Sequence, residues 1–341
     1  MADEGAFGVS IGAMTLQDPP DSAHVELPEV ESKLITVRDP AIATVVENAP
    51  CTYGKSNAWV RNIALDVSGT ALAGAFRAGQ AFGVLPPGED ERGRPHKVRL
   101  YSIASPEAGE DGNGKVICTP VKRVVDEYWV SKNNAEDRRG LFMGVCSNYL
   151  CDLRLGEEVR ITGPVGKRFL LPVHPEQHHH VFVATGTGIA PFRGMVLELL
   201  NNYPRDTGIE IWLLMGVPYT TDLLYHEQFL ELARTHDNFH YLQALSREPR
   251  ADGARGTYVD ELIPMHQDRL APVLADPHTV LYLCGLLGLP FNIYRRLATL
   301  DLLDGYAVDA RETLPTDPAE WTPEAARRAL KPTERCMIEV Y

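Results

Sequence analysis

The pattern of apolar residues changes near residue 172, and this change most constrains the fold. Before it, short apolar or alternating runs are separated by glycine and proline, which is typical of an antiparallel barrel. A single short helix is expected within residues 144–155. The expected strands span residues 58–67, 81–85, 98–104, 115–125 and 158–164.

After residue 172, short apolar runs alternate with stretches of helical periodicity. Such alternation predicts a parallel sheet with helices on both faces. The fold class is therefore two-domain: an antiparallel β-barrel followed by an α/β domain with a parallel sheet. We expect a mobile N-terminal tail over residues 1–28, a barrel domain over 29–172 and an α/β domain over 173–341. Strands are expected at residues 181–184, 209–217, 238–245 and 279–284, and helices at 191–201, 222–236, 259–270, 289–300 and 323–330.

The charge and the N-terminus narrow the class of protein. The 341 residues carry a formal net charge of −13, which argues against general nucleic-acid binding because that function needs a basic surface. No apolar run is long enough to span a membrane. The acidic N-terminus lacks the basic start of a secretory signal. We therefore expect a cytoplasmic protein.

The six cysteines include no C-x2-C pair. Cys146 and Cys151 have the first spacing of a plant-type iron–sulfur loop, but the C-x2-C that should follow is missing. We therefore expect no metal site, and thiols that are reduced and mostly buried.

Residues 185–191 (TGTGIAP) lie between a short apolar run and a stretch of helical periodicity. Gly186 and Gly188 allow a sharp turn and a close approach of a ligand, and Pro191 suits a first helical turn. Free backbone N–H groups at the start of a helix favour a pyrophosphate. Because proline replaces the third glycine of the dinucleotide fingerprint, an ordinary strand-to-helix turn stays open as an alternative.

A second group of residues indicates which nicotinamide cofactor, NAD(H) or NADP(H), the chain binds. The expected strand at 238–245 is followed by Ser246 and Arg247, where selectivity for NAD usually requires a carboxylate. Arg255 and Tyr258 follow shortly. Arginine suits a 2′-phosphate and a tyrosine ring can stack on adenine, so the cluster indicates NADP(H). Exposed loop residues are the alternative.

Residues 99–102 (RLYS) and the last residue, Tyr341, provide two rings that can enclose a flat cofactor. Side chains alternate along a strand, so Arg99 and Tyr101 share one face and Ser102 points to the other. Arg99 can hold a pyrophosphate while Tyr101 lies on a flavin ring. An ordinary barrel strand with a core tyrosine is the alternative.

With these motifs in order, the chain resembles the plant-type ferredoxin–NADP(+) reductases over roughly residues 55–341. The resemblance rests on residues 99–105, 144–153 (GVCSNYLCDL), 185–192 and 338–341 (IEVY). It implies that the barrel binds FAD and the α/β domain binds NADP(H). It also implies hydride exchange between NADP(H) and flavin N5, and one-electron exchange with ferredoxin or flavodoxin.

The same resemblance implies the roles of individual residues. FAD contacts are expected for Arg99, Tyr101, Ser102, Val145, Cys146 and Ser147. NADP contacts are expected for Lys122, Thr187, Val217, Pro218, Ser246, Arg247, Tyr258, Gly285 and Leu286, and, with an extra residue of spacing, for Arg255. The cofactor-binding set also includes Leu100, Val121, Glu339 and Tyr341. The catalytic group is Ser102, Cys284, Glu339 and Tyr341.

Several positions depart from the family pattern. Ala184 replaces a glycine before the phosphate loop, and Asp126 stands where a tyrosine often stacks on the FAD adenine, with Tyr128 as the candidate replacement. Leu287-Gly288-Leu289-Pro290 replaces a small-basic-Gly-Met pattern. Residues 307–332 are expected to form an extra surface excursion.

A basic stretch gives a candidate docking surface for an acidic electron carrier, although a solvated surface is the alternative. The docking surface consists of Arg92, Arg94, Lys97, Arg138, Arg139, Lys167 and Arg168.

Two other functions stay open for the chain. One is the reductase component of an oxygenase or other dedicated acceptor system, and the other is a non-catalytic flavin-binding interaction module.

Overall fold

The computed structural model describes residues 24–56, 58–129, 139–203, 208–250, 252–309 and 314–341. Its first half forms a six-stranded antiparallel sheet in the order β4-β3-β8-β1-β2-β5. The N–H of Ala104, just after β4, donates to Cys118 O in β5 at 2.8 Å, so the two outer strands meet and the sheet curls into a barrel. The strands are β1 (Ala41–Pro50), β2 (Val60–Asp66), β3 (Ala81–Val84), β4 (Arg99–Ser102), β5 (Val116–Lys122) and β8 (Glu158–Val165).

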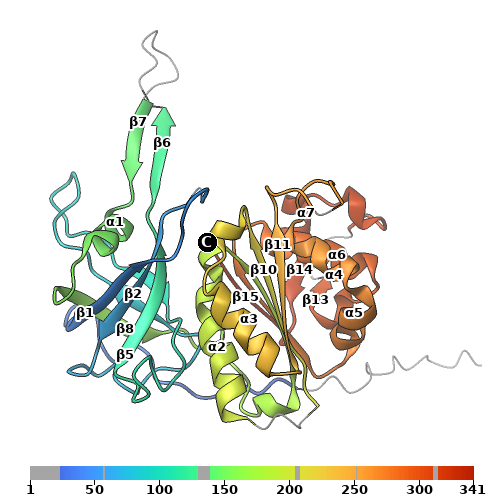
Figure 1. Cartoon of the computed structure of the whole chain (residues 1–341), viewed down its shortest axis with the longest axis horizontal. Helices are drawn as coiled ribbons and strands as arrows, with labels where there is room; N and C mark the ends of the chain where they lie inside the picture. The colour runs from blue at the N-terminus through green and yellow to red at the C-terminus, as the bar shows by residue number, and fades with distance from the viewer. Residues whose placement is uncertain (1–23, 57, 130–138, 204–207, 251, 310–313) are drawn as a thin grey trace, which may run out of the picture.

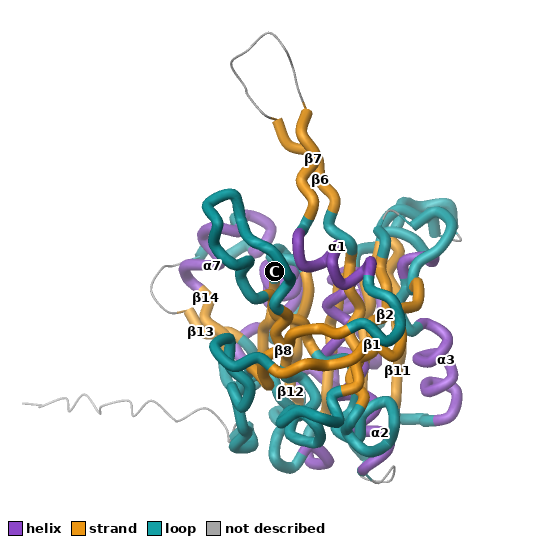
Figure 2. Tube along the Cα trace, turned by 90° about the vertical axis from the view of Figure 1, so that its left-hand side faces the viewer, coloured by secondary structure: helices purple, strands orange, loops and turns teal. Residues whose placement is uncertain are grey.

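Inward-facing apolar residues such as Ile63, Leu65, Phe82 and Ile161 fill the barrel. Helix α1 (Val145–Asp152) covers one end of it. A hairpin of β6 (Val125–Trp129) and β7 (Arg139–Met143) projects from the body of the molecule, as Figures 1 and 2 show from two sides.

The second half forms a parallel five-stranded sheet in the order β11-β10-β9-β12-β15. Strands β9, β10 and β12 are buried along almost their whole length, which is why they read as continuous apolar runs. The strands are β9 (His179–Thr185), β10 (Ile211–Val217), β11 (Phe239–Leu245), β12 (Thr279–Gly285) and β15 (Cys336–Val340).

Helices cover both faces of this sheet, as the sequence predicts. α2 (Ile189–Asn202) and α3 (His226–Thr235) pack on one face through Phe192, Met195 and Phe229. α2 lies between the sheet and the barrel (Figure 1). The other face is covered by α4 (Leu262–Met265), α5 (Gln267–Ala275), α6 (Leu289–Thr299) and α7 (Pro323–Ala329).

The structure corrects several expected elements. The predicted helix at 222–236 begins only at His226, because residues 220–222 form a 3-10 turn and Tyr225 has a left-handed φ of 55°. The predicted helix at 259–270 is divided at His266, whose backbone is not helical, and then runs on to Ala275. Strand β1 has no counterpart among the expected strands, nor has the β6–β7 hairpin.

The excursion at 307–332 packs against the sheet rather than standing free. Its ends pair as β13 (Ala307–Asp309) and β14 (Leu330–Pro332). Trp321 and Ala326 are buried against the core under α6. Any partner contact of the described residues of this segment is therefore limited to their outer side.

Most of the expected N-terminal tail, residues 1–23, lies outside the described residues. Within residues 24–28, Val25 is 5% exposed and packs on the core that α2 shares with the sheet. The N–H of Val173 donates to Glu26 O at 2.9 Å. The predicted domain boundaries themselves stay predictions.

Candidate functional site

A cavity of about 530 Å³ lies between the barrel and the carboxyl ends of the parallel strands. Thr52, Ala58 and Lys122 line it from the barrel side. The edge of a parallel sheet at the carboxyl ends of its strands is where this class of sheet binds ligands. The cavity gathers many residues that the sequence singles out, namely Lys122, Thr187, Val217, Pro218, Ser246, Arg247, Tyr258, Leu286 and Tyr341.

The predicted phosphate loop joins β9 to α2 at this edge. Residues 186–188 form one 3-10 turn, and α2 begins at Ile189 with no side chain capping its N-terminus. Gly186 has a φ of 55°. A Cβ atom at Gly188 would lie 2.2 Å from Cys284 O. Glycine is therefore favoured at position 186 and required at position 188. Because the N–H of Ile189 already donates to Gly186 O and Thr187 O, an anion at this edge would meet the N–H groups of the 3-10 turn itself.

Tyr341 lies directly over this loop. Its hydroxyl and Thr187 Oγ1 share a hydrogen bond of 2.6 Å, and its N–H donates to Gly285 O at 2.9 Å. The residue is nevertheless 60% exposed. The ring thus lines the cavity without being packed into a core.

Cys284 and Glu339 are neighbours across the β12–β15 ladder. Burial raises the pKa of Glu339 to about 7. Burial, and then the charge of Glu339, raise the pKa of the Cys284 thiol well above its usual range. At neutral pH the thiol is therefore uncharged, while the carboxyl is close to half-protonated.

The end of β11 is tied to the end of β10, since the N–H groups of Ser246 and Arg247 donate to Val217 O and Pro218 O, each at 2.9 Å. Arg247 lines the cavity. Arg255 does not line it, and its Nη2 lies 2.5 Å from Glu261 Oε1. The sequence analysis missed this partner, although Glu261 stands three residues after Tyr258 at the start of a helical stretch, where a carboxylate is common.

The predicted flavin residues lie on the barrel. Arg99 and Leu100 are exposed on β4, while Tyr101 is half-buried and its ring centroid lies 6.3 Å from that of Phe82. Burial and the neighbouring Cys146 raise the pKa of Tyr101. Ser102, at the end of β4, pairs with Ala81 in the ladder. Val121 lies in the barrel core.

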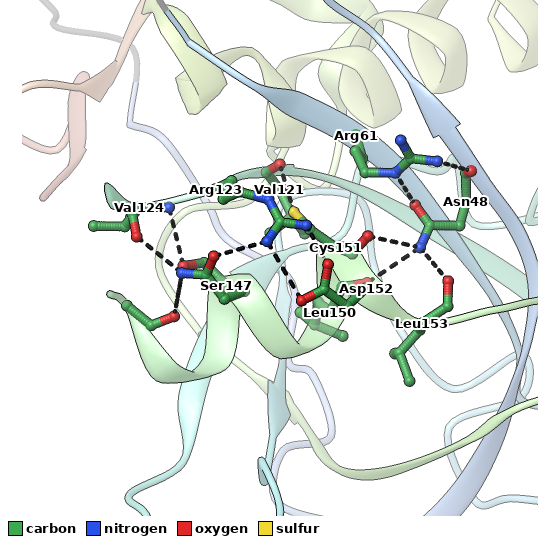
Figure 3. Close-up of polar contacts among 12 residues, drawn as sticks. Asn48, Arg61, Val121, Arg123, Val124, Ser147, Leu150, Cys151, Asp152 and Leu153 are labelled. Atoms are coloured by element: carbon green, nitrogen blue, oxygen red, sulfur yellow. Dashed lines mark hydrogen bonds and ion pairs between the residues drawn. The ribbon is translucent and has the colours of Figure 1, made fainter. Parts of the chain in front are cut away.

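Helix α1 begins next to this strand and is fastened to the barrel at both ends. The side-chain amide of Asn48 donates to Leu150 O and Leu153 O at 3.2 and 2.7 Å, and Arg123 donates to Asp152. Figure 3 shows these contacts. At the start of the helix, Ser147 Oγ accepts from the N–H of Val124 and donates to Gly144 O, each at 3.2 Å. The hydroxyl of Ser147 therefore stabilises the first turn of α1. Of the polar groups of Ser147 at this end of the helix, the backbone N–H is left for a ligand.

The residues on this face fit a dinucleotide with a flat apolar ring. Leu100 is 55% exposed and Val145 47% exposed, so apolar surface is left open here. The N-terminus of α1 has no side-chain cap and no acidic residue in its first turn. Together with Arg99, these free N–H groups suit a pyrophosphate.

Sequence reasoning missed the barrel loop between β1 and β2. Thr52 and Ala58 line the cavity from this loop. Ser56 donates a short hydrogen bond to Asp222, which ties the loop to the α/β domain. No motif marks this loop, and it becomes visible only once β1 is known to be a strand.

All six cysteines are free, and five of them are buried, as expected. Within the described ranges, no cluster of three or more His, Cys, Asp or Glu side chains has the arrangement of a metal site. In the same part of the chain, no helix is both long and apolar enough to cross a bilayer.

A barrel and a parallel nucleotide-binding sheet with a cavity at their junction define a dinucleotide-dependent oxidoreductase. The family described as "Oxidoreductase NAD-binding domain" matches residues 182–290. The ferredoxin–NADP reductase of Picosynechococcus sp. is 35% identical over 309 residues, which are 89% of this chain and 70% of that protein. The chloroplastic leaf isozyme 1 of Arabidopsis thaliana is 35% identical over 269 residues, 78% of this chain and 68% of that protein. The chain belongs to the ferredoxin–NADP reductase family.

A solved structure agrees with this fold. The ferredoxin–NADP+ reductase of Plasmodium falciparum, with 2′P-AMP, has a TM-score of 0.63 at 19% identity, over 91% of this chain and 99% of that chain. At this identity the likeness concerns the fold alone. It confirms the predicted order of a barrel followed by an α/β domain.

Proposed function

We propose that this chain is an FAD-dependent ferredoxin (or flavodoxin)–NADP(+) oxidoreductase. The observation that carries the proposal is the position of Tyr341, whose hydroxyl binds Thr187 in the phosphate loop, where both residues line the cavity between the two domains. Membership of the ferredoxin–NADP reductase family supports the same activity. Bound FAD would accept a hydride from NADPH and release its electrons singly to the carrier, or act in reverse.

On the nicotinamide side, we assign the pyrophosphate to the Thr187 loop and the backbone N–H groups of its 3-10 turn. Ser246 and Arg247 bind the 2′-phosphate, and the exposed ring of Tyr258 stacks on adenine. Arg255 is assigned a smaller contribution to binding the 2′-phosphate, because its guanidinium forms an ion pair with Glu261. The remaining nicotinamide contacts are assigned to Lys122, Val217, Pro218, Gly285 and Leu286.

On the flavin side, Arg99 and the N–H groups at the start of α1 bind the pyrophosphate, with Val145, Cys146 and Ser147 in that first turn. Tyr101 lies along the ring. Leu100, which is exposed, is assigned as an apolar contact, and Ser102 donates near the reacting edge. Val121 is 1% exposed in the barrel core, so only its backbone is left for a contact.

Four residues form the proposed catalytic group. Tyr341 covers the nicotinamide position and must move aside, at a cost of about 1 kcal/mol for the lost stacking and about as much for the Thr187 hydrogen bond. Cys284 presents an uncharged thiol that limits the room for the nicotinamide. Glu339, with its pKa near 7, holds a proton that it can pass towards Ser102.

The proposal also includes the surface on which the electron carrier docks. Arg92, Arg94 and Lys97 lie in the exposed segment before β4. Arg94 binds Asp90 with two nitrogens, at 2.7 and 3.0 Å, so its charge is partly balanced. Lys167 and Arg168 are also exposed, and Arg139 begins β7. Arg138 lies outside the described residues. Local pairing with acidic residues on the carrier is the expected mode of binding.

An absorbance spectrum with an NADPH titration tests the proposal. A yellow protein that is bleached by NADPH, and that reduces cytochrome c only when ferredoxin or flavodoxin is added, is the expected result. Reduction of cytochrome c only with an oxygenase partner would favour the alternative acceptor system, and a protein that binds FAD without turnover would favour the interaction module. The cytoplasmic location stays a prediction, which cell fractionation tests.

A further inference from the structure

Helix α2 contacts the barrel directly, on the side away from the sheet. Gly194 packs so closely that a Cβ atom there would lie 2.5 Å from Ser105 O. Ala190 forms a small apolar cluster with Ala104 and Cys118. The helix that begins at the phosphate loop therefore also rests on the barrel segment that follows β4.

Arg193 lies at the centre of this contact, and its side chain is only 10% exposed. Its two terminal nitrogens hold the two carboxylate oxygens of Glu110, at 2.6 and 3.1 Å. Nη1 also donates to Ala104 O at 3.0 Å, and Nε donates to Gln228 Oε1 at 2.8 Å. The ring of Tyr225 lies 4.8 Å from the guanidinium carbon. Three separate segments are thus bound by one planar group.

Glu110 is itself fixed within the barrel. Ser105 Oγ donates to Glu110 Oε1 at 2.7 Å and accepts from the N–H of Cys118 at 2.8 Å. Burial alone would raise the pKa of Glu110, but the hydrogen bonds and the charge of Arg193 hold this pKa below its usual range. The pair is therefore charged at neutral pH, and its bidentate geometry allows little sliding.

This network connects the two proposed cofactor sites through a few residues. Ala104 follows Ser102 of the proposed flavin strand by two residues, and Arg193 follows Gly188 of the phosphate loop by five. Hydride transfer requires the reacting atoms to approach within about 3–3.5 Å, and a displacement of about 1 Å can cost on the order of 10²-fold in rate. The separation of the two sites must therefore be fixed closely.

We propose that Arg193 is a positioning residue that sets the distance between flavin and nicotinamide while touching neither. The inference rests on the proposed function, because it presupposes both cofactors. It predicts that loss of the bidentate contact slows hydride transfer without weakening the binding of FAD or NADP+.

Arg193→Lys in the FAD-loaded protein tests this, because lysine keeps the charge and loses the two-pronged contact. We expect the hydride-transfer rate constant at saturating NADPH, measured by stopped flow, to fall by about tenfold to a hundredfold. FAD content and the Kd for NADP+ should stay within about twofold. Amide hydrogen exchange of residues 103–110 should become faster, because the junction opens more often.

Arg234→Lys is the matched control, since Arg234 forms an exposed pair with Glu231 within α3; it should change neither rate nor exchange. A rate constant for Arg193→Lys within about twofold of the parent, or a loss explained by weaker cofactor binding, overturns the inference. Should Arg193→Lys prove insoluble, Glu110→Gln tests the same contact from its partner. A parent protein that binds no FAD contradicts the proposed function instead, and hydrogen exchange then still decides whether Arg193 holds the junction.

Discussion

The hydroxyl of Tyr341 and the hydroxyl of Thr187 share a hydrogen bond of 2.6 Å, although 154 positions separate the two residues. Tyr341 follows directly after β15, and Thr187 lies in the turn between β9 and α2. The contact places the ring over the loop that we assign to the dinucleotide. Tyr341 and the nicotinamide therefore compete for one position.

Tyr341→Ser should tighten NADP+ binding and slow turnover, because the nicotinamide no longer has to displace a ring and is released more slowly. An affinity gain of about tenfold corresponds to about 1.4 kcal/mol. Tyr341→Phe keeps the ring and removes only the hydrogen bond to Thr187, so its gain should be smaller. Titration of the flavin spectrum with NADP+ measures both, and an affinity equal to that of the parent would exclude the gating role.

Glu339 should make both activity and stability depend on pH. Since its folded pKa of about 7 lies above the ordinary value of 4.5, the folded state binds more protons between these values. Its contribution to stability is therefore complete below about pH 4.5 and is lost as the pH rises through about 7. Urea unfolding of the parent and of Glu339→Gln at pH 5 and pH 8 isolates this part as the difference between the two proteins.

The same carboxyl should appear in the kinetics. We expect kcat of the parent to change with an apparent pKa near 7, and we expect Glu339→Gln to lose that transition. A transition that persists unchanged in the variant would assign it to another group.

Arg247→Ala should weaken NADPH far more than NADH, because the lost charge faces the 2′-phosphate that only NADPH carries. The loss of one charge-assisted contact is worth about 1.5–3 kcal/mol, or roughly tenfold to a hundredfold in KM. Arg255→Ala serves as the comparison and should have the smaller effect, since Glu261 already holds that guanidinium. Equal losses for the two coenzymes would remove Arg247 from phosphate recognition.

Lys97→Glu should raise the KM for the electron carrier more than Arg94→Glu does. Asp90 balances much of the charge of Arg94, while no ion pair with Lys97 occurs among the described residues. The difference should shrink at high ionic strength, because exposed charges are screened. Carrier-dependent cytochrome c reduction measures it, and a KM unaffected by both reversals would reject this docking surface.

The sequence predicts those parts of the fold in which one residue after another is buried. All residues of β10 are buried, so the apolar run at 209–217 identifies it almost to its ends. β1 is not predicted from the sequence. Its pairing with β2 shifts between Val45 and Glu47, and this bulge interrupts the alternation of apolar and polar residues on which a strand prediction depends.

The candidate site, too, is predicted from the sequence only where its residues are close together along the chain. The phosphate loop is visible in the sequence because turn, glycine and helix start are neighbours along the chain. The contact of Arg193 with Glu110 is not visible, since 83 positions separate the partners and no local pattern requires either residue. The pairing of Arg255 with Glu261 is an intermediate case, because its partner is only six positions away.

Burial of α2 from Ile189 to Leu200 has a consequence for dissecting the molecule. Because α2 is covered by the sheet on one side and by barrel residues on the other, a cut at residue 172 would remove the barrel residues that bury it. The released fragment would expose Gly194 and Ala190 to water and leave the Arg193 guanidinium without its counter-charge. The two halves should therefore melt in a single transition, and a nucleotide-binding half expressed alone should aggregate.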